Sequence, residues 1–171
     1  MATRSVIAIS KGDGWEGLYI HNSGYPTAIG PELWEVLREC SFAQDTFEIQ
    51  FLTAHPGGYS SFPSQCYCHA MGEQDSDGRY TAASEEDNAA LFIEYVYIVG
   101  RRVLTILVSV KSQGSLTHDN GVYQWEEPRY RWARLGAYRL EPTEPDWADI
   151  ETQADQLREE VARVIGDERA A

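Results

Sequence analysis

Residues 91–110 read LFIEYVYIVGRRVLTILVSV, two runs of β-branched, aromatic and aliphatic residues separated by Gly100 and Arg101. Such residues favour strands, and a two-residue connection with glycine first suits a type II′ turn. Apolar side chains alternate onto both sides of the first run, as in a strand that is covered on both faces. The stretch therefore predicts a hairpin of residues 91–99 and 102–110 at the centre of a sheet.

Shorter runs with strand character lie on either side of this hairpin. Residues 5–10 and 15–21 flank the turn-forming segment 11–14, KGDG, which predicts an N-terminal hairpin with a four-residue connection. Further strands are predicted at residues 46–52, 122–125 and 130–140. Residues 55–88 are rich in glycine and proline, and we assign no regular structure to them. Long loops of this kind usually carry function or move.

Helices are predicted on both sides of these strands. A short amphipathic helix begins at Pro31, where the missing N–H of a first-turn proline costs nothing. A longer helix follows Asp146, whose side chain suits the N-cap, and ends at Gly166, a C-cap residue type. We expect one α+β domain over residues 1–140, with a mostly antiparallel sheet and a short helix after the N-terminal hairpin. Residues 141–171 form an acidic helix that packs on this domain or serves association.

Composition limits the classes of partner. The chain has 171 residues, 43% of them hydrophobic and 24% charged, as in ordinary globular proteins. Its net charge is −13, and residues 141–171 hold ten acids against three arginines. This excess disfavours direct binding to nucleic acid or to an anionic membrane, because such binding needs clustered cations.

The chain also lacks the features of an exported or membrane protein. Its apolar runs are too short to span a bilayer, and the N-terminus shows no signal peptide. An odd count of three cysteines suits free thiols in a reducing compartment. We therefore expect a cytoplasmic protein.

The densest set of metal-ligand side chains is His55, Cys66, Cys68 and His69. Two thiolates and two imidazoles match the ligand types of a tetrahedral zinc site. The spacing argues against zinc, since paired cysteines in such sites are usually separated by two to four residues, and we expect no cofactor. A buried apolar role for the cysteines is the preferred interpretation, and a Cys–His nucleophilic pair with His55 or His118 is a further alternative.

Two further sets of residues are candidate ligand contacts. The turn before the first helix supplies His21, Ser23 and Tyr25. Backbone N–H groups at a helix start attract anions, although we prefer to interpret this segment as a shaped turn. The second set is cationic and lies among aromatic residues: Arg129, Arg131, Arg134 and Arg139. Arginines in this setting suit stacking and phosphate contacts, but internal pairing with the acidic C-terminal helix is favoured.

The C-terminal helix carries an apolar seam made of Trp147, Ile150, Leu157, Val161 and Val164. A seam at spacings of three and four residues packs either on the sheet of the same chain or on a partner helix. We expect the former, and a partner helix or a homodimer is the alternative.

Several of these segments together resemble a functionally uncharacterised family of small proteins from bacteriophages and actinobacteria. The likeness covers residues 3–110: an N-terminal strand, a Ser-Gly-Tyr-Pro turn before a helix, the segment CYCH and the central hairpin. Members usually carry an acidic residue at the position of Ser23, so a ligand contact there would differ in this chain. The resemblance implies no catalytic residues.

These observations favour one class of function. No nucleotide-binding, hydrolase or metalloprotease motif occurs in the chain. The acidic excess and the apolar seam favour a non-enzymatic binding or regulatory protein that acts through a protein partner, such as a phage-type accessory or anti-defence inhibitor. The alternative is a small-ligand or nucleotide-binding module, and the third hypothesis is a zinc- or cysteine-dependent enzyme.

Overall fold

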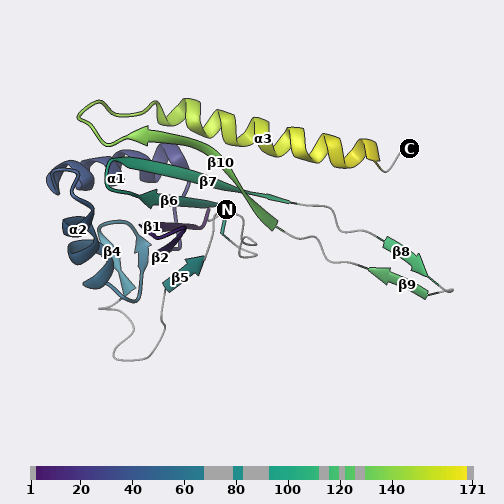
Figure 1. Ribbon diagram of the computed structural model, residues 1–171, viewed down its shortest axis with the longest axis horizontal. Coiled ribbons are helices and arrows are strands. Elements are labelled where there is room, and N and C mark those ends of the chain that lie inside the picture. The colour runs from purple at the N-terminus through teal and green to yellow at the C-terminus, as the bar shows by residue number, and fades with distance from the viewer. Residues whose placement is uncertain are drawn as a thin grey trace.

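The computed structural model describes residues 3–67, 79–82, 93–111, 116–119, 122–125 and 130–168 of the chain (Figure 1). The strands of its main sheet are β1 (Ser5–Lys11), β2 (Gly14–Ile20), β3 (Tyr59–Ser61), β4 (Gln65–Cys66), β5 (Arg79–Ala82), β6 (Tyr95–Val99), β7 (Val103–Lys111) and β10 (Tyr130–Arg139). A separate hairpin consists of β8 (Leu116–Asp119) and β9 (Val122–Trp125). The helices are α1 (Pro26–Glu39), α2 (Gln44–Phe47), the π-helical η1 (Glu48–Thr53) and α3 (Trp147–Glu168).

The arrangement of strands confirms an α+β fold with a mostly antiparallel sheet. The order is β10-β7-β6-β1-β2-β3-β4, and β5 also pairs with β2. Among the described strands, the β1–β6 and β2–β3 pairs are parallel and the others antiparallel. β6 therefore lies between β1 and β7, and all its residues are buried, as its continuous apolar run predicts.

The central hairpin forms as predicted, but its turn lies one residue later. The N–H of Gly100 donates to the carbonyl of Val103 at 2.8 Å, which leaves Arg101 and Arg102 in the bend. A Cβ at Gly100 would lie 3.2 Å from the Val103 oxygen, so this glycine provides space and not a left-handed backbone.

The N-terminal hairpin also forms, with a shorter connection than predicted. Lys11 pairs with Gly14, which leaves two residues in the turn and not four. Gly12 adopts a φ of 60°, as the first central position of a type II′ turn requires.

The first helix begins at Pro26, and its predicted start at Pro31 is wrong. Pro26 occupies the first turn, where a proline needs no N–H partner, and Tyr25 precedes it in an extended conformation. Pro31 lies exposed inside the helix. Gly30 packs against α3 so closely that an added Cβ would lie 2.3 Å from the indole of Trp147.

The strand predicted at residues 46–52 does not form, because α2 and η1 occupy that segment. Phe47 is fully buried, and its ring stacks on that of Phe51 with centroids 5.5 Å apart. Side chains four positions apart meet on one side of a helix, whereas in a strand they would be far apart. This contact and the burial of Phe47 outweigh the strand propensity of the segment.

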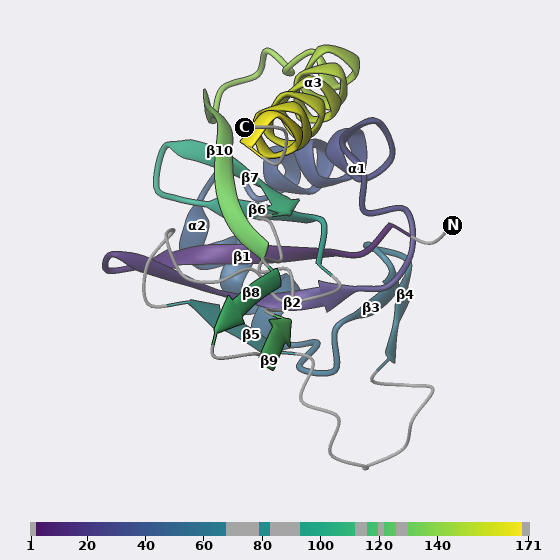
Figure 2. The same cartoon turned by 90° about the vertical axis from the view of Figure 1, so that its right-hand side faces the viewer.

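The start of the last helix is as predicted and its end is not. Asp146 accepts hydrogen bonds at Oδ1 from the N–H groups of Ala148 (3.1 Å) and Asp149 (3.0 Å), which confirms the N-cap. α3 continues through Gly166, so this glycine is not its C-cap. Figure 2 shows α3 beside α1, with β10 passing close to α3.

Helices cover one face of the main sheet, which we call the helix face. The strand residues buried on it include Ile7, Tyr95, Tyr97, Leu104 and Ile106, and they form one cluster with residues of α1, α2 and α3. The opposite face, which we call the strand-lined face, buries Val6, Ala8, Trp15, Ile93, Val96, Ile98, Leu107 and Trp132. No residue of a described helix belongs to this second cluster.

Two tryptophans show how the strand-lined face is closed. Trp15 on β2 and Trp132 on β10 meet edge to face, with ring centroids 6.3 Å apart. Their strands are separated by β7, β6 and β1, which in a flat sheet would place them about 19 Å apart. Twist must therefore bring opposite corners of the sheet toward each other, so that the sheet buries its own face.

The contact of Gly30 with Trp147 predicts that alanine substitutions at residues 30 and 31 affect the stability of the fold differently. We expect Gly30→Ala to destabilise the fold by about 1–3 kcal/mol, because the new methyl group displaces the indole. Pro31→Ala, at the exposed next position, should be neutral or stabilising because it restores a helical N–H. Urea denaturation followed by circular dichroism measures both, and equal effects would contradict the packing described.

Candidate functional site

The predicted ligand-binding turn is held tightly by the rest of the chain. The N–H of Gly24 donates to the carbonyl of Thr3 (2.9 Å), and the buried Tyr97 hydroxyl donates to the carbonyl of Gly24 (2.9 Å). A Cβ on Gly24 would lie 2.6 Å from the Ser5 hydroxyl oxygen. Ser23 has a φ of 56°, a left-handed conformation that the turn imposes. The glycine thus serves close packing, which matches the interpretation as a shaped turn.

The polar side chains of this segment also have structural contacts. The Nδ1 atom of His21 lies 2.9 Å from the Tyr19 hydroxyl. The carbonyl of Tyr25 accepts the first hydrogen bonds of α1, from Ala28 and Ile29, while its side chain is 38% exposed. His21 thus has a contact within β2 and its end, and Tyr25 serves the start of α1 through its carbonyl group.

The turn adjoins the segment with the predicted metal ligands. The N–H groups of His21 and Asn22 donate to the carbonyls of Tyr59 and Ser60, each at 3.0 Å. A cavity of about 640 Å³ opens beside this junction, lined by His55, Ser60, Pro63, Ser64, Gln65, Cys66 and Tyr67. Two predicted residues, His55 and Cys66, thus share one cavity.

His55 is the better described of these two residues. Within the described part of the chain, its Nδ1 atom is buried without a hydrogen-bond partner, and its ring lies 5.2 Å from that of Tyr59. Cys68 and His69 lie outside the described residues, and within the described part no three potential ligands cluster around a common point. His118 lies on β8, in the separate hairpin. Zinc binding and Cys–His chemistry therefore stay predictions.

The predicted arginine cluster lies across the sheet from His21. Arg129 is outside the described residues and Arg131 is placed by its backbone, but Arg134 is exposed on β10. β10 and β2 are separated by three strands in the sheet. Arg134 and the Gly24 turn thus belong to separate regions of the sheet, and a nucleotide site formed by both sets of residues stays a prediction.

Two arginines that were not predicted as candidates join the predicted Arg139. The β6–β7 bend places Arg101 and Arg102 beside Arg139 at the end of β10, where Leu140 donates its N–H to the carbonyl of Arg102 (3.0 Å). All three arginines are exposed, and none forms an ion pair within the described residues. The predicted neutralisation by α3 therefore does not extend to Arg139 in the described part of the chain.

The first turns of α3 are buried in the chain itself. Trp147 and Ile150 belong to the helix-face core, and the Trp147 ring meets that of Trp34 with centroids 6.0 Å apart. The Glu151 carboxylate accepts hydrogen bonds from the N–H (3.1 Å) and the hydroxyl (2.6 Å) of Thr27, and so caps the start of α1. Trp147 and Ile150 are therefore not available for the alternative partner-helix role.

Farther along α3, the seam is less deeply covered. Leu157 and Val161 are half-buried against the core, and Val164 is placed by its backbone. Arg158 fastens this part to β6: its guanidinium lies 4.8 Å from the Tyr95 ring centroid and donates to the Tyr95 hydroxyl (3.1 Å). Burial raises the pKa of Tyr95, an effect that the Arg158 charge opposes.

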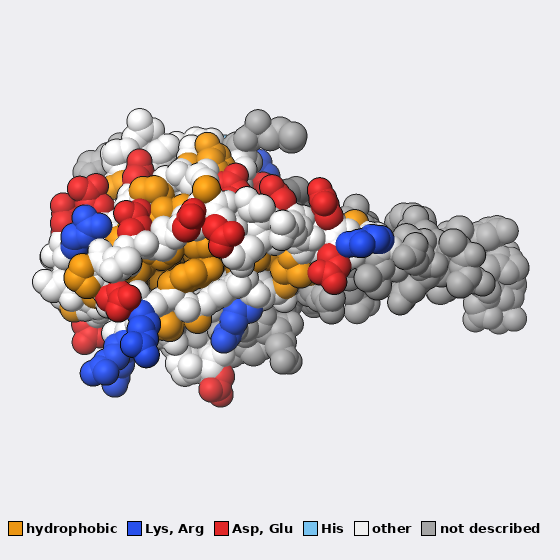
Figure 3. Space-filling view, turned by 90° about the horizontal axis from the view of Figure 1, so that it is seen from above, with side chains coloured by type: hydrophobic (Ala, Val, Ile, Leu, Met, Phe, Trp, Pro, Cys, Tyr) orange, Lys and Arg blue, Asp and Glu red, His pale blue; other side chains and the backbone are white. Residues whose placement is uncertain are grey.

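Half-buried apolar side chains also lie along β10 where it meets α3. They are Leu135, Tyr138 and Leu140, and together with Leu157 and Val161 of α3 we call them the ledge. Seen from above, hydrophobic side chains reach the surface in a band bordered by carboxylates and by Lys and Arg side chains (Figure 3). The ledge lies next to the outer edge of β10, which has β7 as its one neighbour among the described strands.

Comparison of the chain with models of protein families, with curated proteins and with solved structures finds no match. The resemblance to phage and actinobacterial proteins therefore stays a prediction. Within the described residues, no helix has both the length and the apolar character needed to cross a membrane.

The buried Tyr97 predicts a loss of stability in alkali. Burial, the largest cause, raises its pKa well above the usual value. Below about pH 10 this tyrosine is neutral in the folded and in the unfolded chain. Above about pH 10 it ionises in the unfolded chain but not in the folded chain. The free energy of unfolding therefore falls by about 1.4 kcal/mol per pH unit because of this group. Tyr97→Phe should remove this share of the slope.

Urea denaturation at a series of pH values tests this expectation. Tyr97→Phe should also lower stability at neutral pH by about 1–3 kcal/mol, because the buried Gly24 carbonyl loses its donor. Tyr25→Phe, at an exposed tyrosine, is the control and should change neither quantity. An unchanged alkaline slope in Tyr97→Phe would contradict the assignment.

Proposed function

We propose that this chain is a non-enzymatic binding protein that acts through a protein partner, and that β10 and the ledge form its contact surface. One observation carries the proposal: β10 is ten residues long and has a neighbouring strand on one side only among the described strands. An edge strand presents unpaired N–H and C=O groups, and proteins usually keep such edges short, interrupted or covered. Here a bulge between Arg134 and Gly136 divides the edge, but the edge is long, contains no proline and lies beside apolar side chains.

The charge of the chain supports a protein partner over nucleic acid. A net charge of −13 repels phosphate, and the one group of exposed arginines that we find in the described residues, at the end of β10, has three members. A role as a phage-type accessory or anti-defence inhibitor is the narrower form of the proposal and draws on the sequence resemblance alone. The zinc- or cysteine-dependent alternative depends on the His55–Cys66 cavity, and the ligand-binding alternative depends on His21, Tyr25 and the arginine cluster.

Affinity capture with a matched pair of variants tests the proposal. Ala137→Pro removes an N–H that points away from β7, whereas Ala137→Val keeps it and favours a strand. Bait proteins are incubated with lysate from cells that naturally contain the chain, and bound proteins are identified by mass spectrometry. We expect a partner that is retained by the natural chain and by Ala137→Val and is lost with Ala137→Pro. Capture of the same proteins by all baits, or of none, would contradict a contact at β10.

A further inference from the structure

The pairing register of β10 shows which backbone groups face outward. Leu140 donates its N–H to Arg102 on the β7 side, so the Leu140–Arg102 and Tyr138–Leu104 pairs are hydrogen-bonded pairs of the antiparallel ladder. Residues between such pairs direct their N–H and C=O groups to the opposite side. Ala137 and Arg139 therefore present their backbone groups to the outer edge, and both are exposed.

Side chains alternate between two different environments along this edge. On the helix face, Leu135, Tyr138 and Leu140 are half-buried against the core. On the strand-lined face, Ala137 and Arg139 are exposed beyond the buried Trp132. A bulge between Arg134 and Gly136 separates the two halves of the strand. A segment that pairs with β10 would thus meet an apolar environment on one face and a cationic one on the other.

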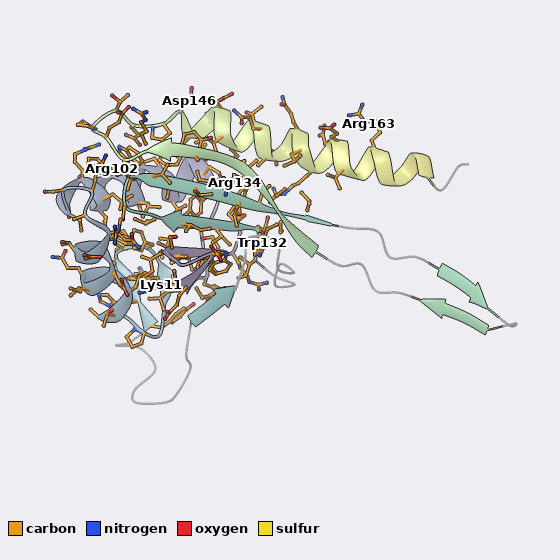
Figure 4. The ribbon with its side chains drawn as sticks, in the orientation of Figure 1. Lys11, Arg102, Trp132, Arg134, Asp146 and Arg163 are labelled. Atoms are coloured by element: carbon orange, nitrogen blue, oxygen red, sulfur yellow. The ribbon has the colours of Figure 1, made fainter. Side chains whose placement is uncertain are left out.

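The two faces of β10 differ in their charged side chains near its end. Arg134 and Arg139 lie on the strand-lined face, opposite Leu107 and Val103, whereas Arg131 pairs with Val110 and lies on the helix face before the bulge. β10 contains no carboxylate. Arg139 lies beside Arg101 and Arg102, and Figure 4 shows Arg102 and Trp132 at opposite ends of β10. On the helix face, Asp149 is close enough to add to the effect of burial in raising the pKa of Tyr138. Acidic side chains are therefore favoured on the arginine face and disfavoured on the helix face.

We propose that β10 pairs with an extended segment of a partner protein in which acidic and apolar side chains alternate. This inference rests on the proposed function and adds the chemistry of the partner. Strand addition uses main-chain hydrogen bonds for affinity and alternate side chains for specificity. A second copy of the chain fits less well, because β10 contains no carboxylate and so offers Arg134 and Arg139 of another copy no acidic side chain to pair with.

Synthetic peptides of the length of β10 provide the test. In each of three peptides, valine alternates with one other residue, which is glutamate, glutamine or lysine. Binding of each peptide to the chain is measured by fluorescence anisotropy at low salt. We expect the glutamate peptide to bind about tenfold more tightly than the glutamine peptide and the lysine peptide to bind most weakly, because several exposed ion pairs of modest strength add together. Ala137→Pro should abolish binding of the glutamate peptide, and Ala137→Val should retain it.

A second pair of variants isolates the arginine face. Arg139→Glu and Arg163→Glu change the net charge equally, but Arg163 projects from α3 on the side away from the sheet (Figure 4). We expect Arg139→Glu to lower the affinity of the chain for the glutamate peptide by about tenfold. Arg163→Glu should leave this affinity nearly unchanged. This pair keeps the test decisive if Ala137→Pro fails to fold.

The outcomes separate the inference from the proposed function. Equal binding of the glutamate and glutamine peptides, with loss on Ala137→Pro, would overturn the acidic partner and leave the contact at β10 intact. If no peptide binds the natural chain, the acidic partner segment and the contact surface at β10 would both be contradicted. A dimer in analytical ultracentrifugation that Ala137→Pro converts to monomer would also overturn the inference, since a second copy would then occupy β10.

Discussion

The structure depends on the need to cover both faces of β6. Its residues alternate between two buried clusters, with Tyr95 and Tyr97 on the helix face and Val96 and Ile98 on the strand-lined face. A strand that is buried on both faces is typical of the interior of a sheet, where other layers cover it from either side. α1 and α3 cover the first face, and the twist that brings Trp15 to Trp132 covers the second. β10 is left as the outer strand of this arrangement, and the proposed contact surface follows from that position.

The features predicted correctly were those that nearby residues determine. The central hairpin, the β9 and β10 strands and the Asp146 cap follow from apolar patterning and capping chemistry within a few positions. The predictions that failed concern elements whose bounds or pairing depend on contacts between residues far apart in the sequence. Pro26 and Pro31 are equally good local signals for a helix start. The helix begins at Pro26, and Gly30, which precedes Pro31, already packs against Trp147 of the distant α3. The parallel β1–β6 pair joins segments too far apart in sequence for local patterns to reveal.

The candidate sites show the same division between local and distant determinants. The Gly24 turn was recognised as unusual, but its contacts with Thr3, Ser5 and Tyr97 could not be predicted from its own residues. His55 and Cys66 do meet at one cavity. Arg101 and Arg102 were missed because the turn register, on which their position beside Arg139 depends, was predicted one residue too early. The seam of α3 was recognised correctly, and its first turns are buried within the same chain.

Amide hydrogen exchange along β10 tests the open edge most directly. The account predicts alternation in the isolated chain: the amides of Tyr138 and Leu140 point to β7 and should exchange at least about a hundredfold more slowly than those of Ala137 and Arg139. Equal protection of all four amides would show that the outer edge is already paired within the chain, and the proposed partner surface would not exist.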